Sequence, residues 1–264
     1  MKPDLLDMDR VLEETFLAGA EYHDSLASTN DRAAECARME AVDLPLLVVA
    51  GRQTAGRGRG GNRWWTGRGS LAMSLVLDVT RSDTGRQIAG GQRDRAALVA
   101  LAAALAVADT VAPLVPSEIV GIHWPNDVMV AGGKLAGVLV EVLSNGRHVL
   151  GIGVNTNNTV ADAPDELKQT AVTLRDLTGK THDPTVLLTE LLRQLETVLG
   201  RLASEPEQRG VRANALCLQR GRTLTLEHGG RRITAPCAGI APDGALLLEM
   251  PEGRRPFYSG VLRK

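Results

Sequence analysis

The stretch that most constrains how this chain can fold is an alanine- and leucine-rich run, QRDRAALVALAAALAVADTVAPLV, at residues 92–115. This composition favours a long helix, and Pro113 predicts where the helix stops. Such a helix would be apolar nearly all round, so other elements must cover most of its sides. Its most apolar part, Ala96–Ala108, is shorter than the roughly 20 residues that cross a membrane. The sequence therefore predicts a buried helix of a soluble protein.

Strand-like runs on both sides of this helix predict a sheet that covers it. The runs rich in Val, Leu and Ile are residues 44–51, 69–79, 121–130, 134–143 and 147–157. Asn145-Gly146 predicts a tight hairpin between the last two runs, and Pro125 breaks the run before them. Further helices are expected at 1–20, at 28–39, and at 181–204 behind the Asp183 cap and Pro184.

The character of the chain changes after about residue 217. Short strand-like runs are separated by HGG, PDG and PEG turns, and no helical stripe remains. These features predict a small all-β module, a barrel, which is small enough to need support from the main domain.

Charge and cysteine content exclude several classes of protein. The chain of 264 residues has 30 basic and 31 acidic residues and a net charge of −1, so it has no global field that attracts nucleic acid. Cys36, Cys217 and Cys237 are far apart in the sequence and lack CxxC spacing. They predict scattered thiols in a reducing compartment, not a disulfide frame or a zinc site. The charged N-terminus shows no signal peptide pattern, so a cytoplasmic protein is expected.

A segment that alternates glycine and arginine, QTAGRGRGGNRWW, occupies residues 53–65. It is neither a dinucleotide fingerprint nor a P-loop, because NRWWTGRGS does not begin a helix and no GKS or GKT follows. Guanidinium groups on a mobile backbone suit bidentate binding of phosphate or carboxylate. A solvated basic loop is an equally good interpretation of this segment alone.

The three tryptophans stand beside polar loops. Trp64 and Trp65 follow the glycine segment, and Trp124 precedes PND. One tryptophan alone would favour core packing, but the clustering of all three at polar loops favours a ligand pocket.

Two further stretches carry polar residues at strand ends. In HWPNDVMVAGGKLAGVLVE, Asn126 and Asp127 suit a place near phosphates and magnesium, although an ordinary turn is a fair alternative. Lys134 can point its ammonium into a cleft or lie at a strand edge. In GIGVNTN, the glycines allow close approach, and Asn155 has the amide needed to contact an adenine edge or to form a turn. No Ser-His-Asp arrangement or pair of metal-binding histidines stands out in the sequence.

Taken in order, the motifs STN at 28–30, QTAGRGRGGNRW at 53–64, WPND at 124–127, KLAGVLVE at 134–141 and GIGVNTN at 151–157 resemble the biotin–protein ligase family. The resemblance runs from about Ser28 to the C-terminus. It implies an α+β fold: a mixed-sheet catalytic domain of the biotin/lipoate ligase type with flanking helices at 1–217, and a small C-terminal SH3-like β-barrel at 218–264.

The resemblance implies a two-step reaction that uses ATP and Mg²⁺. Biotin and ATP give biotinyl-5′-AMP, and biotin then passes to a lysine of the biotin carboxyl carrier protein domain of a carboxylase. The residues that it places against biotin are Ser28, Thr29, Asn30, Gln53, Gly56, Arg57, Gly58, Arg59, Lys134 and Gly137. Those it places against ATP are Arg57, Arg59, Trp64, Asn126, Asp127, Lys134 and Asn155. The implied catalytic residues are Lys134, Arg57 and Arg59, and Asp127 is the implied magnesium ligand.

The sequence departs from the family pattern in two places. The loop reads GRGRGGN where many bacterial members have GRGRRGR, so Gly60 and Asn62 replace basic residues, and His123 stands where lysine is usual. Too few residues precede Ser28 for a helix-turn-helix, so no nucleic acid partner is expected. No membrane partner is expected either, because the apolar run 96–108 is too short to span a membrane. The protein is expected to be a monomer or a homodimer. The alternatives are a lipoate–protein ligase and a non-catalytic biotin sensor. The loop argues against the lipoate enzyme, and Lys134 with the loop arginines argues against the sensor.

Overall fold

The computed structural model describes residues 6–79 and 92–263, with the backbone alone for 92–94, and arranges their strands in two sheets. The large sheet has seven strands in the order β1-β2-β3-β7-β6-β5-β4. Its strands are β1 (Gly19–His23), β2 (Leu46–Ala50), β3 (Leu71–Leu77), β4 (Val120–His123), β5 (Asp127–Val130), β6 (Gly133–Val142) and β7 (His148–Val154). The β1–β2 pair is parallel and the other neighbouring pairs are antiparallel, so the sheet is mixed.

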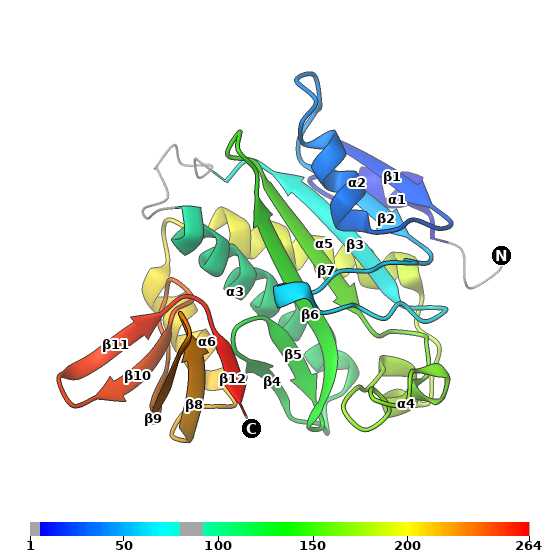
Figure 1. Ribbon diagram of the computed structural model, residues 1–264. Helices are drawn as coiled ribbons and strands as arrows, with labels where there is room; N and C mark the ends of the chain where they lie inside the picture. The colour runs from blue at the N-terminus through cyan, green and yellow to red at the C-terminus, as the bar shows by residue number, and fades with distance from the viewer. Residues whose placement is uncertain (1–5, 80–91, 264) are drawn as a thin grey trace.

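One face of this sheet is covered by α3 (Gln92–Val111) and α5 (Pro184–Gly200), which lie side by side behind it (Figure 1). The Asp183 carboxylate caps α5 by accepting from the backbone N–H groups of Thr185 and Val186. The leucine stripe of α5 packs on α3 and joins the main hydrophobic core. Since α3 is covered from both sides, its alanines from Ala102 to Ala108 are buried, as the sequence predicts.

The helix α3 is longer than its most apolar part suggests. It has 20 residues, and a 3-10 turn, η2 (Ala112–Leu114), follows. Among the described residues, this is the one segment (Arg95–Leu114) long and apolar enough to cross a membrane by length and composition. Because 67% of that window is buried inside the protein, the apolar surface is used for packing.

The opposite face of the sheet is only partly covered. The helix α2 (Thr29–Cys36) begins at Ser28, whose side chain accepts from the backbone N–H of Asp31. Its alanines pack on Val48, Val76 and Val149 in a second, smaller core. The part of this face beyond α2 lies under the segment that follows β2, which includes the turn η1 (Arg59–Gly61) (Figure 1).

The C-terminal strands form an antiparallel sheet in the order β11-β10-β9-β8-β12. They are β8 (Thr223–His228), β9 (Arg231–Ile240), β10 (Leu246–Met250), β11 (Gly253–Phe257) and β12 (Val261–Arg263). The helix α6 (Pro206–Leu216) contacts both β9 and β4, and lies between the small sheet and the large one (Figure 1). Buried side chains of the module, such as Leu246 and Phe257, join the main core. The support that the small module was expected to need comes from this shared packing.

The remaining helical elements are α1 (Met8–Glu14), η3 (Val160–Asp162) and α4 (Leu174–Thr178). The predicted α+β class with a mixed sheet, flanking helices and a small C-terminal β module is confirmed.

Several local predictions were wrong. The helix expected at 1–20 is α1 followed by the edge strand β1, and residues 1–5 lie outside the described part. The predicted break of the run 121–130 at Pro125 is confirmed, but the chain also reverses there, and β4 and β5 form a hairpin that turns at the cis peptide bond between Trp124 and Pro125. The helix α6 was not predicted. Two of the three cysteines, Cys217 and Cys237, are not scattered in space, because each thiol shifts the pKa of the other, although no disulfide joins them.

Candidate active site

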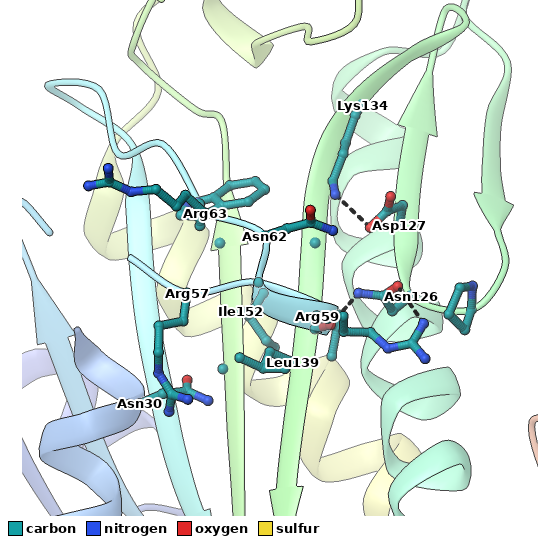
Figure 2. Close-up of a pocket in the computed structure, with 18 of the residues that line it drawn as sticks. Asn30, Arg57, Arg59, Asn62, Arg63, Asn126, Asp127, Lys134, Leu139 and Ile152 are labelled. Carbon is teal, nitrogen blue, oxygen red and sulfur yellow. Dashed lines mark hydrogen bonds and ion pairs between the residues drawn. The ribbon is translucent and has the colours of Figure 1, made fainter. Parts of the chain in front are cut away.

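The glycine–arginine segment folds into a hairpin, which we call the strap, residues 56–64. The Trp64 N–H donates to the Gly56 carbonyl at 2.9 Å, and the Gly58 N–H donates to the Asn62 carbonyl at 2.7 Å. At the tip, Gly60 has a φ of 62° and Gly61 a φ of 81°. These left-handed conformations strain side-chain-bearing residues, which gives a physical reason for glycine at position 60. The strap lies over the uncovered part of the large sheet (Figure 2).

Beneath the strap, β6 and β7 form a floor that is rich in glycine, because side chains from other elements lie directly on these strands. Across β6 and β7, Gly137 pairs with Gly153, and Leu139 pairs with Gly151. A Cβ on Gly153 would lie 2.3 Å from the Trp64 ring, and one on Gly151 would lie 1.9 Å from Asn30 Oδ1. The glycines of GIGVNTN therefore receive Trp64 and Asn30 against the sheet.

One end of the cleft is polar and uncharged. Gln53 Oε1 accepts from the Thr29 backbone N–H at 2.8 Å and lies 3.1 Å from the Thr29 hydroxyl. The hydroxyl of Ser74 on β3 lies 2.8 Å from Thr29 Oγ1 and 2.7 Å from Asn30 Oδ1. Ser28, Thr29 and Asn30 are all buried, so this network is held rigidly at the start of α2.

Arg57 lies beside this polar end and is held by carboxylates. Its guanidinium donates to both oxygens of Glu141, at 2.9 and 2.5 Å, and lies 2.9 Å from the Asp31 carboxylate. Glu141 also accepts from Asn30 Nδ2 at 2.8 Å. Burial tends to lower the pKa of Arg57, but the hydrogen bonds to Glu141 raise it above its usual value. Glu141 thus links the strap to α2.

The other end of the cleft carries Lys134, Arg59, Asn126 and Asp127, which point toward one another (Figure 2). Lys134 Nζ lies 2.7 Å from Asp127 Oδ1 and 5.6 Å from the centre of the Trp64 ring. Arg59 Nη1 lies 3.4 Å from Asn126 Oδ1. Burial lowers the pKa of the Arg59 guanidinium, while the charge of Asp127 raises it. A cation with so little hydration is well prepared to bind an anion.

The cleft has a volume of about 580 Å³, within the usual range for a small-molecule site. Five of its lining residues are basic by type: Arg57, Arg59, Arg63, Lys134 and Arg263. Among the described residues, the one acidic side chain that lines it is Asp127. The excess of positive charge favours a carboxylate or phosphate ligand over a cationic one.

Most of the predicted site residues line this cleft, and Asn155 and Gly56 do not. Asn155 borders a neighbouring cavity of about 1050 Å³, where its amide accepts from Asn158 Nδ2 at 3.2 Å. Gly56 lies at the base of the strap with Trp64 against it. All three tryptophans border a cavity: Trp64 lines both, Trp65 lines the neighbouring one, and Trp124 lines the cleft although it is only 1% exposed. Trp124 thus borders the cleft from the core, and its indole N–H donates to the Gly244 carbonyl of the β module.

Sequence reasoning missed Glu141, Ser74 and Asp31. Glu141 ends the KLAGVLVE motif, and its charge in an otherwise apolar strand was the available signal. Ser74 stands in the apolar run LAMSLVL, where a lone hydroxyl likewise needs a partner. Nothing in the sequence around Asp31 distinguishes it from an ordinary helix-start acid.

The donors available for a metal ion are few. No group of three or more His, Cys, Asp or Glu side chains gathers in the ranges 6–79 and 92–263. Asp127 stands at the cationic end of the cleft, and one carboxylate together with substrate phosphates is a usual way to bind Mg²⁺. The residues present therefore fit a magnesium ion that arrives with a nucleotide.

A mixed sheet with a strapped, cationic cleft beside a small β module defines a small-molecule-activating enzyme domain with an appended module. Residues 22–157 match the Biotin/lipoate A/B protein ligase family, and the chain belongs to that family. It is 35% identical over 245 residues to the biotin–[acetyl-CoA-carboxylase] ligase of Mycobacterium tuberculosis, and the alignment covers 91% of this chain and 84% of that protein.

Two further relatives agree with this assignment. The chain is 31% identical over 239 residues to the biotin–[acetyl-CoA-carboxylase] ligase of Paracoccus denitrificans, covering 87% of this chain and 95% of the relative. Among solved structures, the biotin protein ligase of Aquifex aeolicus in complex with biotin and ATP superposes with a TM-score of 0.78 at 26% identity. That match covers 94% of this chain and 100% of the Aquifex chain, so the resemblance seen in the motifs extends over the whole fold.

Proposed function

We propose that this chain is an ATP-dependent biotin–protein ligase. It forms biotinyl-5′-AMP from biotin and ATP, and then transfers the biotinyl group to a lysine of a carboxylase carrier domain. The observation that carries the proposal is the division of one cleft into an uncharged polar end and a cationic end. Biotin has the matching division, with an uncharged ureido ring at one end and a carboxylate at the other.

In the first step, a biotin carboxylate oxygen attacks the α-phosphorus of ATP, and the bond from that phosphorus to the pyrophosphate oxygen breaks. Ser28, Thr29, Asn30 and Gln53 bind the ring system, and Gly56, Gly58 and Gly137 let the strap and floor approach the acyl chain. Lys134 is near enough to both groups to neutralise the charge that builds between carboxylate and phosphate. The chain contributes position and charge, not a nucleophile.

Arg57 and Lys134 have to exchange their ion-pair partners when the ligand binds. Arg57 is paired with Glu141 and Asp31, and Lys134 is paired with Asp127. An incoming carboxylate or phosphate offers the same kind of acceptor, so it exchanges one ion pair for another. Asp127, once released by Lys134, is available to the magnesium ion that accompanies ATP, and Arg59 and Asn126 lie next to it.

In the second step, the lysine ε-amine of the carrier attacks the acyl carbon, and AMP leaves with the phosphate oxygen. Water must be kept from this mixed anhydride until the carrier lysine arrives. The strap over the floor, with Trp64 on Gly153, performs that exclusion. We place Asn155 at the adenine through the cavity that it borders beside Trp64 and Lys134.

We infer the domain boundaries, the partner, the cellular location and the oligomeric state from the same family assignment. The catalytic domain comprises residues 1–217 and the β module 218–264, and the partner is a biotin carboxyl carrier protein domain. The protein is cytoplasmic, a monomer or a homodimer, and binds neither membrane nor DNA. Tight binding to a promoter of biotin-synthesis genes would overturn the last point.

The deciding experiment mixes the protein with MgATP, biotin and an isolated carrier domain, and measures the mass of the carrier. The expected result is a mass gain of one biotinyl group that needs ATP. A parallel reaction with lipoate tests the main alternative. Gain with lipoate and none with biotin would assign the chain to the lipoate enzymes, and no gain with either acid, despite measurable biotin binding, would favour a sensor.

A further inference from the structure

The end of α6 and the middle of β9 bring two cysteines together. Cys217 is the C-cap of α6, and Cys237 lies within β9. The Gly221 N–H donates to the Cys237 carbonyl at 2.8 Å, and the Cys237 N–H donates to the Arg222 carbonyl at 2.8 Å. The turn that begins at Cys217 is therefore fixed along the strand that carries Cys237. Neither thiol is in a disulfide, and each shifts the pKa of the other.

The two thiols have opposite properties. The neighbouring Cys237 thiol, together with the backbone N–H groups of Gln219 and Arg220, lowers the pKa of the Cys217 thiol to about 7, although burial opposes this. The same thiol pair and burial raise the pKa of Cys237. Cys217 is partly exposed and Cys237 is 3% exposed. One sulfur is thus partly exposed and partly ionised near neutral pH, and its neighbour is buried and protonated.

We propose that Cys217 and Cys237 are a redox-active pair that forms a reversible disulfide by exchange with a low-molecular-weight disulfide. The Cys217 thiolate attacks one sulfur of that disulfide, which releases one small thiolate and leaves a mixed disulfide on Cys217. Cys237 then loses its proton and attacks Cys217 Sγ, which releases the second small thiolate. The protein loses two electrons, and the small disulfide is reduced to two thiols.

This pair lies where the β module meets the catalytic sheet. Beside Cys217, the Leu218 N–H donates to the Ile122 carbonyl at 3.1 Å. Gln219 Oε1 accepts from the Trp124 backbone N–H at 3.2 Å and lies 3.8 Å from Cys217 Sγ. Oxidation removes the Cys217 thiol proton from this group and joins α6 covalently to β9. The disulfide therefore fastens the β module to the end of β4, next to the hairpin turn that carries Asn126 and Asp127.

Cys36 is the internal comparison. It lies at the end of α2 and is 2% exposed, burial raises its pKa, and its Sγ lies 3.7 Å from Glu21 Oε1 of β1. It has the burial of Cys237 without a thiol neighbour among the described contacts. At pH 7 we expect Cys217 to react with iodoacetamide on the order of ten times faster than Cys36.

The test incubates the reduced, full-length protein with oxidised glutathione, blocks the remaining thiols and digests with trypsin without reductant. Cys217 falls in the tryptic peptide 213–220 and Cys237 in the peptide 233–254. The expected product is these two peptides joined by a disulfide that dithiothreitol reverses. The Cys36→Ser variant should give the same product, and Cys237→Ser should accumulate glutathione on Cys217.

Three results would overturn the proposal: no linked peptide when a reference dithiol in the same tube is fully oxidised, glutathione retained on Cys217 of the wild-type protein, or equal alkylation rates for Cys217 and Cys36. The first two use the wild-type chain, so a variant that fails to fold does not affect them. None of the readouts depends on ligase activity, so failure here leaves the proposed function untouched.

Discussion

The two faces of the large sheet are made by the same strands but serve different purposes. Toward α3 and α5, β7 presents Leu150 and Ile152, which are buried in the main core. Toward the strap, the same strand presents Gly151 and Gly153, against which Asn30 and the Trp64 ring lie. The alternation of a β-strand assigns each residue to one face. Side chains on one face provide stability, and their absence on the other provides room, so changes on the two faces should have separable effects.

The largest effect on the helix-covered face is expected for Leu188→Ala in α5. Leu188 is 0% exposed, and truncation of a fully buried leucine costs about 2–5 kcal/mol through lost burial and the cavity left behind. Urea unfolding measures this free energy, and KM for biotin should stay within about twofold. Val186→Ala on the same helix, 49% exposed, is the matched control. A raised KM at unchanged stability would contradict the separation of the two faces.

On the cleft face the largest effect is expected for Lys134→Ala. If its ammonium stabilises the charge that develops in the reaction, turnover falls by roughly a hundredfold or more. The stability of the fold should hardly change, because the Lys134–Asp127 pair is partly exposed. Steady-state biotinylation of the carrier domain measures turnover, with Lys168→Ala, which removes an exposed pair with Asp165, as the control. Near-normal turnover would remove Lys134 from the catalytic role.

Gly153→Ala tests whether the glycine floor matters. The added Cβ would lie 2.3 Å from the Trp64 ring and must displace it, which we expect to raise KM roughly tenfold. The comparison is Leu150→Ala on the other face of the same strand, which should lower the free energy of unfolding by about 2–5 kcal/mol and leave KM unchanged. Titration of biotin and ATP into each variant gives the answer. An unchanged KM in Gly153→Ala, together with a raised KM in the comparison variant, would contradict the role of the glycine floor.

A smaller effect is expected for Glu141→Gln. Since Arg57 leaves Glu141 to meet the ligand, removal of that charge should tighten binding of biotinyl-5′-AMP by up to about fivefold. Glutamine keeps an oxygen that can accept from Asn30, so the polar end of the cleft stays intact. Equilibrium competition binding measures the affinity, and Asp31→Asn should act in the same direction. Weaker binding would show that Glu141 organises the bound state instead.

The smallest effect concerns pH and His148, which β7 buries to 1% exposure. Burial lowers its pKa, with the nearby Arg95 contributing in the same direction, while a backbone hydrogen bond at Gly146 and the charge of Asp78 oppose this. The unfolded chain then binds a proton more readily than the folded one, so stability falls as pH drops below the usual histidine pKa of about 6.5. The wild-type protein should lose about 1 kcal/mol more than His148→Leu between pH 7.5 and 5.5. Equal pH dependence of the free energy of unfolding in the two proteins would contradict this. Burial also lowers the pKa of His182, so both proteins should keep some loss of stability as the pH falls.

The sequence was sufficient where a local rule decides the structure. Asp183 and Pro184 begin α5 as predicted, Asn145-Gly146 turns the β6–β7 hairpin, and the glycine segment forms a strap. The residues that line the cleft were largely found because motif order carries information that no single motif has. The family assignment rests on the same order of motifs.

What could not be predicted depends on contacts between distant residues. Trp124 is a core residue because its indole meets Gly244 across the β module. Arg57 pairs with Glu141, and Cys217 meets Cys237, only after the sheets have packed. Pro125 indicated a break in a strand, but the reversal into β4 and β5 depends on how β5 pairs with β6. The local sequence pattern predicts helices and strands, whereas the packing of these elements decides which distant side chains come into contact.

The central claim is that the acid and the nucleotide bind on the glycine floor beneath the strap. The most direct measurement is a crystal structure with a non-hydrolysable analogue of biotinyl-5′-AMP. The account predicts the ring system against Thr29 and Gln53 and the phosphate within hydrogen-bond distance of Lys134. Density for the analogue in the separate cavity that Arg68 and Arg175 line, with the strap cleft empty, would contradict it.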